Sequence, residues 1–261
     1  MKSLTLWTRY AALGASSRLR FLQFIPELEK NGWCVNAETF FDDEYLHNLY
    51  SGGGKSLISL FRSWLHRKRA MRTASPETPA FIEYELLPYL PYGAEKKFLE
   101  TRRYVLNFDD DVTLRYRRYP HLRHKFFRLA EHAAGVIVAN NALQELFAPF
   151  NGNILHLPTV PPPLPEVAVK KDEHFTLVWT GTPITFPFLA QRQKALAIAA
   201  EKLHFKLLIV GGGAAIDGVD CEVLPWSERT EAEALARAHV GIMPLDDTPF
   251  ARGKSAYKLI R

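Results

Sequence analysis

The hydrophobic and polar positions along the chain alternate between two kinds of segment. Short apolar runs are typical of buried strands, and longer stretches between them have helical periodicity. Over residues 1–160 the apolar runs predict strands at Ser3–Thr8, Trp33–Phe40, Ala80–Glu83, Tyr104–Phe108, Val136–Ala139 and Ile154–Leu157. Helices are predicted at Ser17–Lys30, Lys55–Met71, Tyr92–Thr101, His121–Ala133 and Asn141–Phe147. Strands that alternate with helices favour a parallel sheet covered on both faces.

A proline-rich segment, Pro158–Pro165, interrupts this alternation. Five of its eight residues are proline, which predicts a semi-rigid linker. After it, strands are predicted at Phe175–Trp179, Lys206–Val210, Glu222–Leu224 and Val240–Met243, and helices at Leu189–Leu203 and Arg229–Ala238. We therefore predict an α/β protein with two Rossmann-like, doubly wound parallel-sheet domains, residues 1–160 and 161–261. The second is expected to be incomplete, because a full doubly wound sheet has about six strands.

Composition and charge narrow the function classes. Of the 261 residues, 47% are hydrophobic, as in an ordinary globular protein, and no apolar run is long enough to span a membrane. The N-terminus lacks the apolar core of a signal peptide, and two cysteines form no metal or disulfide pattern, so a cytoplasmic location is expected. The whole net charge of +5 lies in residues 1–160, which favours an anionic partner: a membrane surface, nucleic acid or a phosphorylated substrate.

The turn after the first predicted strand is a candidate anion site. Gly14 permits a tight turn, and Ser16 or Ser17 can cap the following helix, which leaves N–H groups for a phosphate or sugar oxygen. Arg18 in the first helical turn opposes the helix dipole unless an anion binds. A plain strand–helix connection is the alternative.

Acidic residues follow two other predicted strands. Asp109, Asp110 and Asp111 come directly after Tyr104–Phe108, where carboxylates could orient a hydroxyl, act as a base or hold a metal; the alternative is a solvated acidic turn. Glu83 and Glu85 end another strand and either line the same cleft or lie on the surface.

Glycine turns in the second half offer a further candidate site. Gly181 and Thr182 follow a strand and could bring backbone and a hydroxyl to a ligand, or form an ordinary turn. The triplet Gly211–Gly213 does not match the dinucleotide fingerprint, which disfavours a Rossmann oxidoreductase. Gly54-Lys55-Ser56 is rejected as a phosphate-binding loop, because Leu49 stands where that motif needs glycine.

The end of the chain carries a cluster of basic residues. After an apolar strand and an acidic turn, Arg252, Lys254 and Lys258 are predicted near the start of a helix. Cations there oppose the helix dipole, which indicates that an anion such as a diphosphate binds to them. The sequence ends without a helix cap, so we expect a truncated domain.

Leu57–Arg72 combines an apolar stripe containing Trp64 with a basic end. This is typical of a helix that lies on an anionic membrane, although a core-packed helix with a solvated basic tail is the alternative. More arginines follow the aspartates, but no nucleic-acid-binding motif is present, and nucleic acid is not expected as a partner.

Three segments together resemble the GT-B glycosyltransferases of the large family 4. They are Gly14–Trp33, Tyr104–Val112 with the following G-V-I-V-A-N-N-A-L, and Val240–Arg261. The resemblance implies two Rossmann-like domains, the first binding an acceptor and the second a nucleotide sugar, with retention of anomeric configuration. The implied partners are a nucleotide sugar and a polysaccharide or lipid-linked acceptor of the cell envelope, at the inner face of the cell membrane.

The resemblance also assigns roles to individual residues. Arg252, Lys254 and Lys258 would stabilise the donor diphosphate as it leaves, which fits the charge developing in the transition state. The Gly14 loop, with Ser16 and Arg18, would approach the same diphosphate, as would Gly181 and Thr182. Leu224 and Trp226 would neighbour the nucleobase, and Asp110 or Asp109 would contact the sugar or the acceptor hydroxyl. No metal or cofactor is implied.

Two departures from the family pattern leave an alternative open. Gly253 and Arg261 stand where many members have glutamates, and a C-terminal part of roughly 80–110 residues is expected to be missing, from four strands against six. A non-catalytic, truncated or degenerate glycosyltransferase-like protein is therefore the alternative to an active enzyme.

Overall fold

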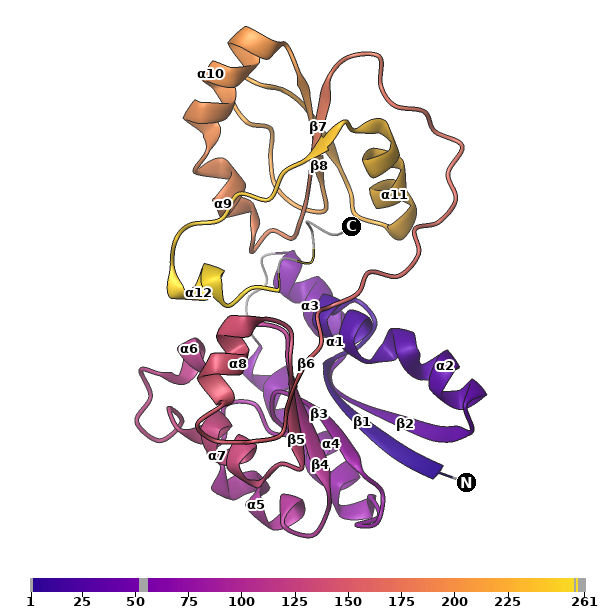
Figure 1. Cartoon of the computed structure of the whole chain (residues 1–261), viewed down its shortest axis with the longest axis vertical. Coiled ribbons are helices and arrows are strands. Elements are labelled where there is room, and N and C mark those ends of the chain that lie inside the picture. The colour runs from indigo at the N-terminus through magenta and orange to yellow at the C-terminus, as the bar shows by residue number, and fades with distance from the viewer. Residues whose placement is uncertain (1, 52–55, 256, 258–261) are drawn as a thin grey trace. The chain divides into compact units, whose positions relative to one another are not determined.

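The structure is a computed structural model that describes residues 2–51, 56–255 and 257. Its contacts divide the chain into two compact units (Figure 1). The first contains Met1–Val160 together with Arg252–Ser255, and the second contains Pro161–Ala251. Each unit has its own sheet and its own hydrophobic core.

The first unit contains a six-stranded sheet in the order β2-β1-β3-β4-β5-β6, and every pair of neighbours is parallel. The strands are β1 (Lys2–Tyr10), β2 (Trp33–Phe41), β3 (Ala80–Glu83), β4 (Tyr104–Phe108), β5 (Gly135–Val138) and β6 (Ile154–His156). All six strands predicted here are confirmed. The central ones are buried on both faces, as their near-continuous apolar sequences require, and Trp7, Phe108 and Phe147 are fully buried between sheet and helices.

The helices of the first unit differ from the predicted ones where a proline interrupts a helix and where two short helices, α3 and α6, lie outside the predicted ranges. They are α1 (Ala15–Arg20), η1 (Leu22–Phe24), α2 (Ile25–Lys30), α3 (Asp43–Tyr50), α4 (Leu57–Thr73), α5 (Gly93–Leu99), α6 (Thr113–Tyr116), α7 (Lys125–His132) and α8 (Asn141–Phe147). The single helix predicted over residues 17–30 is wrong. Pro26 has no N–H to continue the preceding turn, so it lies in the first turn of α2, which begins at Ile25, and a 3₁₀ turn separates α2 from α1.

The second unit contains a four-stranded parallel sheet in the order β10-β7-β8-β9. Its elements are β7 (Thr176–Thr180), α9 (Phe186–Ala190), α10 (Gln193–Leu203), β8 (Lys206–Val210), β9 (Asp220–Leu224), α11 (Glu228–Arg237), β10 (Val240–Gly241) and α12 (Pro249–Arg252). The predicted helix Leu189–Leu203 is interrupted between α9 and α10, and β10 ends two residues earlier than predicted.

Alternate residues of β8 build two separate cores in the second unit. Leu207 and Ile209 pack with Trp179 and Leu189 on one side, whereas Leu208 and Val210 belong to a cluster with Ala234 of α11. Because successive strand residues point to opposite faces, both faces of this sheet are covered. This confirms the predicted α/β class with parallel sheets.

The proline-rich segment has no helix or strand from Leu157 to Lys171. Its beginning is held to the first unit, because Arg20 Nη1 donates to the Leu157 carbonyl at 2.6 Å and Gln23 Nε2 donates to the Val160 carbonyl at 3.0 Å. Its far end is held to the second unit by an ion pair of 3.1 Å between Asp172 and Arg237.

Within the described ranges, no helix combines the length and the apolar character needed to cross a bilayer.

Replacing Phe108 by alanine should lower the free energy of unfolding of the first unit by about 3–5 kcal/mol, because this side chain is fully buried against Phe126 and Phe147. Hydrogen exchange read by mass spectrometry localises the effect: peptides of β1 and β3–β5 should exchange faster and those of β7–β9 should not. Leu208→Ala in the core of the second unit is the matched control. It should speed exchange in peptides of β7–β9 and leave those of β1 and β3–β5 unchanged. If Phe108→Ala loosened β7–β9 as strongly as β3–β5, the two cores would not be separate.

Candidate functional site

Three neighbouring strands of the first unit end at the same edge of the sheet. β1, β3 and β4 are adjacent and parallel, so the residues after Tyr10, Glu83 and Phe108 come together. The chain leaves β1 toward β2 on one side and returns to β3 on the other, which makes the β1–β3 boundary a topological switch point. Ligands of open α/β sheets bind at such points.

Glu83 is the buried carboxylate at this boundary. It accepts hydrogen bonds from the Ser16 hydroxyl at 2.7 Å, from the Ser17 hydroxyl at 2.5 Å and from the Arg9 backbone N–H at 2.7 Å. Burial raises the pKa of Glu83, and these hydrogen bonds oppose the rise. Glu83 therefore connects the loop after β1 and the start of α1 to the end of β3. Both Glu83 and Glu85 are buried, so the alternative that they lie on the surface is wrong.

The candidate anion-binding residues of this loop have partners within the protein. Gly14 is required by packing, since a Cβ atom there would lie 2.2 Å from Tyr10 Cβ. The Ser16 hydroxyl binds Glu83, which carries the same sign of charge as a diphosphate. Arg18 Nη1 donates to the Ala12 carbonyl at 2.7 Å, so its guanidinium folds back over the loop.

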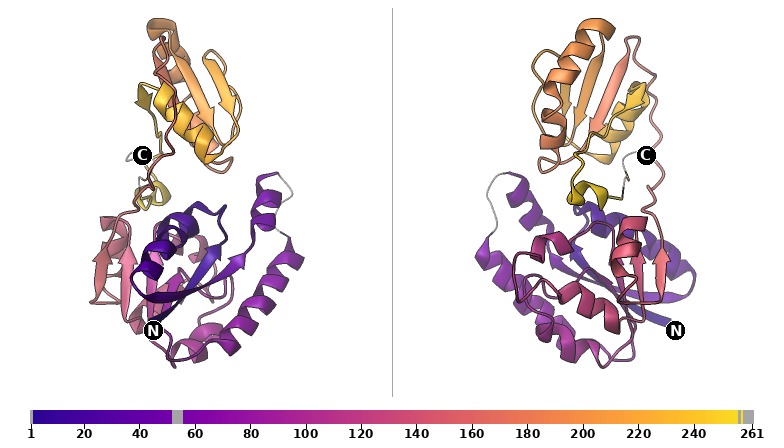
Figure 2. Two further views of the ribbon diagram at one scale, coloured as in Figure 1. Left: turned by 90° about the vertical axis from the view of Figure 1, so that its right-hand side faces the viewer. Right: turned by 60° about the vertical axis from the view of Figure 1, so that its left-hand side comes forward.

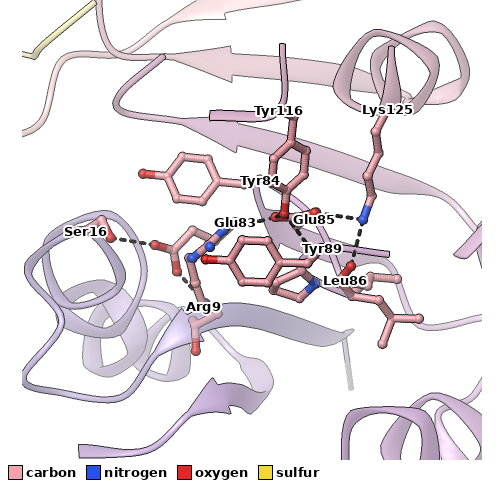
Figure 3. Close-up of polar contacts among 12 residues, drawn as sticks. Arg9, Ser16, Glu83, Tyr84, Glu85, Leu86, Tyr89, Tyr116 and Lys125 are labelled. Carbon is pink, nitrogen blue, oxygen red and sulfur yellow. Dashed lines mark hydrogen bonds and ion pairs between the residues drawn. The ribbon is translucent and has the colours of Figure 1, made fainter. Parts of the chain in front are cut away.

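A buried ion network lies beside Glu83 (Figure 3). Glu85 accepts from Arg9 Nη1 at 3.0 Å, from the Tyr116 hydroxyl at 2.8 Å and from Lys125 Nζ at 2.7 Å. Lys125 Nζ also lies 2.5 Å from Glu95 Oε1, and the Glu95 carboxylate accepts the backbone N–H groups of residues 86 and 87. The network fixes the segment after β3 against β1, α5 and α7.

The charges of this network stabilise one another against the cost of burial. Burial alone would raise the pKa of Glu85, but Lys125 and Arg9 outweigh it and hold that pKa below its usual value. Burial likewise would lower the pKa of Lys125, but Glu85 and Glu95 raise it. Sequence reasoning missed Arg9, Glu95 and Lys125. The sequence signal for the network was Arg9 itself, a cation that directly follows the predicted apolar strand Ser3–Thr8.

Tyr84 and Asp109 contact each other at this edge of the sheet. Tyr84 has a φ of 61°, which a residue with a side chain rarely adopts, and its hydroxyl donates to Asp109 Oδ1. Burial and the adjacent Asp110 carboxylate raise the pKa of Asp109 to about 7, against the opposing hydrogen bond from Tyr84. A carboxyl group that titrates near neutral pH can take up or release a proton at the pH of the cell.

The other two aspartates have different roles. Asp111 Oδ1 accepts from the Thr113 backbone N–H at 3.0 Å and from the Thr113 hydroxyl at 2.5 Å, so it caps the turn that begins α6. Asp110 Oδ2 lies 3.5 Å from Lys254 Nζ. Of the three, Asp111 fits the alternative of an acidic turn.

The segment Arg252–Ser255 belongs to the first unit and packs on the ends of β4 and β5. A Cβ atom on Gly253 would lie 2.7 Å from Asp111 Cβ, and the Gly253 carbonyl accepts from Asn140 Nδ2 at 3.0 Å. The prediction that Arg252 and Lys254 lie at a helix start is wrong. Pro249 begins α12 and Gly253 follows its end, so Arg252 is the last helical residue and Lys254 lies in the turn beyond. Lys258 lies outside the described residues.

In the second unit, the turns after β7, β8 and β9 pack on one another. The Gly181 N–H donates to the Val210 carbonyl and the Gly211 N–H donates to the Leu224 carbonyl, both at 2.9 Å. Gly211 has a φ of +96°, and a Cβ atom there would lie 2.3 Å from the Gly181 carbonyl oxygen. The glycines are thus required by contact between the turns, and the predicted residues Gly181 and Leu224 lie on either side of the end of β8.

Trp226 and Thr182 flank these turns. The Trp226 side chain is 37% exposed, and its indole N–H donates to Glu231 Oε2 at 3.2 Å, which fixes the ring at the edge of the sheet. The Thr182 backbone N–H donates to the Thr185 hydroxyl at 3.1 Å, as in an ordinary turn that opens a helix. An exposed, oriented indole beside tightly turned backbone is suited to stacking on a planar ring.

Across the described part of the chain, His, Cys, Asp and Glu side chains do not gather in groups of three or more that could hold a metal ion. A cavity of about 650 Å³ lies between β2, α3 and α4, and its lining includes Ile58 and Arg62 of the predicted membrane-contact segment Leu57–Arg72.

Lys125→Met should lower the free energy of unfolding by about 3–5 kcal/mol at neutral pH, because it leaves two buried carboxylates without their shared cation. The pKa of Glu85 is lowered in the folded state, so its stabilising contribution is present above its unfolded pKa of about 4.3 and is lost as pH falls through the folded value. The deficit measured by urea unfolding should therefore shrink in acid. Adding Glu85→Gln to Lys125→Met should recover part of the loss; no recovery would contradict the pairing.

Asp109→Asn should flatten the dependence of stability on pH. The pKa of Asp109 rises from about 4 in an unfolded chain to about 7 in the fold. Its contribution is therefore full below the unfolded value and is lost as pH rises through the folded one. Urea unfolding over this range measures the effect. Tyr84→Phe removes a hydrogen bond that favours the ionised carboxylate and should extend the loss to higher pH. Equal pH profiles for wild type and Asp109→Asn would refute the raised pKa.

Comparisons with known proteins give the fold. No protein-family model matches the sequence, and no curated protein matches it. Among solved structures, the chain is similar to the α,α-trehalose 6-phosphate synthase from Burkholderia multivorans, at 11% identity and a TM-score of 0.58 over 99% of this chain and 81% of that one. It is also similar to the UDP-forming α,α-trehalose-phosphate synthase from Burkholderia vietnamiensis, at 10% identity and a TM-score of 0.58 over 99% and 81%.

A Listeria monocytogenes protein assigned as a UDP-N-acetylglucosamine 2-epimerase is similar at 10% identity and a TM-score of 0.54, over 98% of this chain and 76% of that one. Identities this low establish a shared fold and leave activity open. The chain has the two-unit α/β architecture of GT-B glycosyltransferases, with parallel sheets of six and four strands among its described residues.

Proposed function

We propose that the protein transfers a sugar from a nucleotide-sugar donor to a glycan or lipid-linked acceptor. The observation that carries the proposal is the turn cluster at the carboxyl edge of the second sheet, where Gly181, Gly211 and Trp226 meet in a GT-B fold. Proteins similar to this chain act on sugar phosphates or UDP-sugars by their names, which favours a uridine diphosphate sugar as the donor.

The second unit is proposed to bind the nucleotide. The exposed Trp226 indole supplies a face for the base, since stacking on an aromatic side chain is worth about 1–3 kcal/mol per base. Leu224 ends the strand below it, and the backbone of Gly181 and Thr182 lies at the same edge.

The donor diphosphate is proposed to bind the cations Arg252 and Lys254. Lys254 already lies 3.5 Å from Asp110, so it is oriented by a carboxylate before a diphosphate arrives. Fixed cations that meet the developing charge of a leaving group lower the barrier, so we propose that they, and no metal, take this role.

In the proposed reaction, the bond between the anomeric carbon and the diphosphate oxygen breaks, and its electron pair leaves with the nucleoside diphosphate. The acceptor hydroxyl oxygen forms the new bond to the anomeric carbon, and its proton passes to a base. Asp109, whose pKa is raised to about 7, or its neighbour Asp110 is the proposed proton acceptor. Retention of configuration, a cell-envelope polysaccharide product and a cytoplasmic location remain parts of this proposal.

Calorimetric titration with UDP, and with GDP for comparison, tests the donor site. Trp226→Ala should weaken UDP binding by about 5- to 100-fold through lost stacking. Lys254→Ala should weaken it by about 10- to 100-fold, because a hydrogen bond to a charged group is worth about 1.5–3 kcal/mol. Lys202→Ala, an exposed lysine of α10, is the matched control and should bind as wild type does.

Absence of nucleotide binding by the wild-type chain would overturn the proposed donor. Binding in which Lys254→Ala makes no difference would overturn the diphosphate assignment alone. Nucleotide binding without hydrolysis or transfer from any UDP-sugar would instead favour the non-catalytic alternative.

A further inference from the structure

Helix α4 is amphipathic in a way that the core of the first unit does not explain. Its inward side chains anchor it: Trp64 Nε1 donates to the Pro88 carbonyl at 2.8 Å, and the buried Arg67 donates from Nη2 to the Thr8 carbonyl at 2.6 Å. Leu60 and Trp64 pack on the aromatic cluster of Phe40 and Tyr45. These residues satisfy the core-packed alternative, although the basic end is not wholly solvated, because Arg67 is buried.

The opposite face of α4 presents large apolar side chains to solvent. Leu57 is 79% exposed, Ile58 68%, Phe61 57% and Leu65 55%. The spacing of Leu57, Phe61 and Leu65 is one helical turn, so they form a continuous stripe. Figure 2 shows α4 on the outside of the first unit. Single exposed apolar residues are ordinary, but four adjacent ones on one helix face mark an interaction surface.

The charges on this helix are of one sign. Leu57–Thr73 contains no Asp or Glu. Lys68 and Arg72 continue the line of Leu57, Phe61 and Leu65 along the same face, and Arg69 follows Ile58 and Leu65 at its flank; all three cations are exposed. The outward face is therefore apolar in its first half and cationic in its second half.

This combination selects one kind of partner. A second copy of the same face would bring like charges together, and nucleic acid would leave four large apolar side chains in water. An anionic lipid surface accepts both parts, because the apolar side chains enter the acyl boundary and the cations meet lipid phosphates. We propose that the outward face of α4, formed by Leu57, Ile58, Phe61, Leu65, Lys68, Arg69 and Arg72, docks the protein on an anionic membrane. This goes beyond the proposed sugar transfer and does not depend on it.

Flotation of the full chain with lipid vesicles tests the proposal. The protein should float with vesicles of equal parts phosphatidylcholine and phosphatidylglycerol, less so in high salt, and should remain unbound with phosphatidylcholine alone. Phe61→Ser with Leu65→Ser should abolish flotation. Lys68→Ala with Arg69→Ala and Arg72→Ala should weaken binding by about 100-fold, from about fivefold for each cation.

The matched control is Ile198→Ser with Leu203→Ser, two exposed apolar residues of α10 at 56% and 62%, which should float as wild type does. Circular dichroism and UDP titration should be unchanged in every variant, because the altered side chains lie outside both cores. Wild type that stays unbound with anionic vesicles, or α4 variants that float like wild type, would overturn the proposal. So would a concentration-dependent dimer in sedimentation that the α4 variants abolish, since this would assign the face to self-association.

Discussion

The first unit depends on one constraint: the buried carboxylate of Glu85 must be neutralised where water cannot reach it. Arg9 and Lys125 meet this requirement from β1 and α7, and Lys125 carries Glu95 of α5 with it. A buried charge without a partner is strongly destabilising, so arrangements of these elements that separate the charges are disfavoured. With these elements in place, Glu83 contacts the loop after β1, and Tyr84 contacts Asp109. The ion network therefore helps to position the side chains at the carboxyl edge of the sheet.

Much of the fold could be predicted because parallel strands buried on both faces are nearly continuous apolar runs. Ala80–Glu83, Tyr104–Phe108 and Lys206–Val210 were predicted with their observed bounds. The failures were local. Pro26 divided a helix whose apolar spacing continues across it, and the turn formed by Gly253 ended a helix that the basic residues were expected to begin.

The candidate site was predictable only in part. The strand ends that carry candidate residues were predicted, because each of them directly follows an apolar run in the sequence. The partners of each side chain could not be found, since they depend on which charges share one buried volume. Ser16 illustrates the difference: its position in the turn after the first strand was predicted, but its bond to Glu83 joins residues far apart in the sequence. Likewise, the apolar residues of α4 form a single stripe in the sequence pattern, but the structure divides them between two faces of the helix. Leu60 and Trp64 pack on the core, whereas Phe61 and Leu65 are exposed.

The ion network also sets an order of events during synthesis. Arg9 lies 76 residues before Glu85, and Glu85 lies 40 residues before Lys125. Arg9 therefore finds its partner only after the end of β3 has been synthesised, and the network is complete only after α7 has been; contacts this distant in sequence make a domain slow to fold. The second unit differs, because its central strands β7 and β8 pair with each other and are joined through α9 and α10 alone. Until Glu85 has been synthesised, Arg9 has no buried carboxylate to pair with and β1 lacks its neighbour β3 in the sheet.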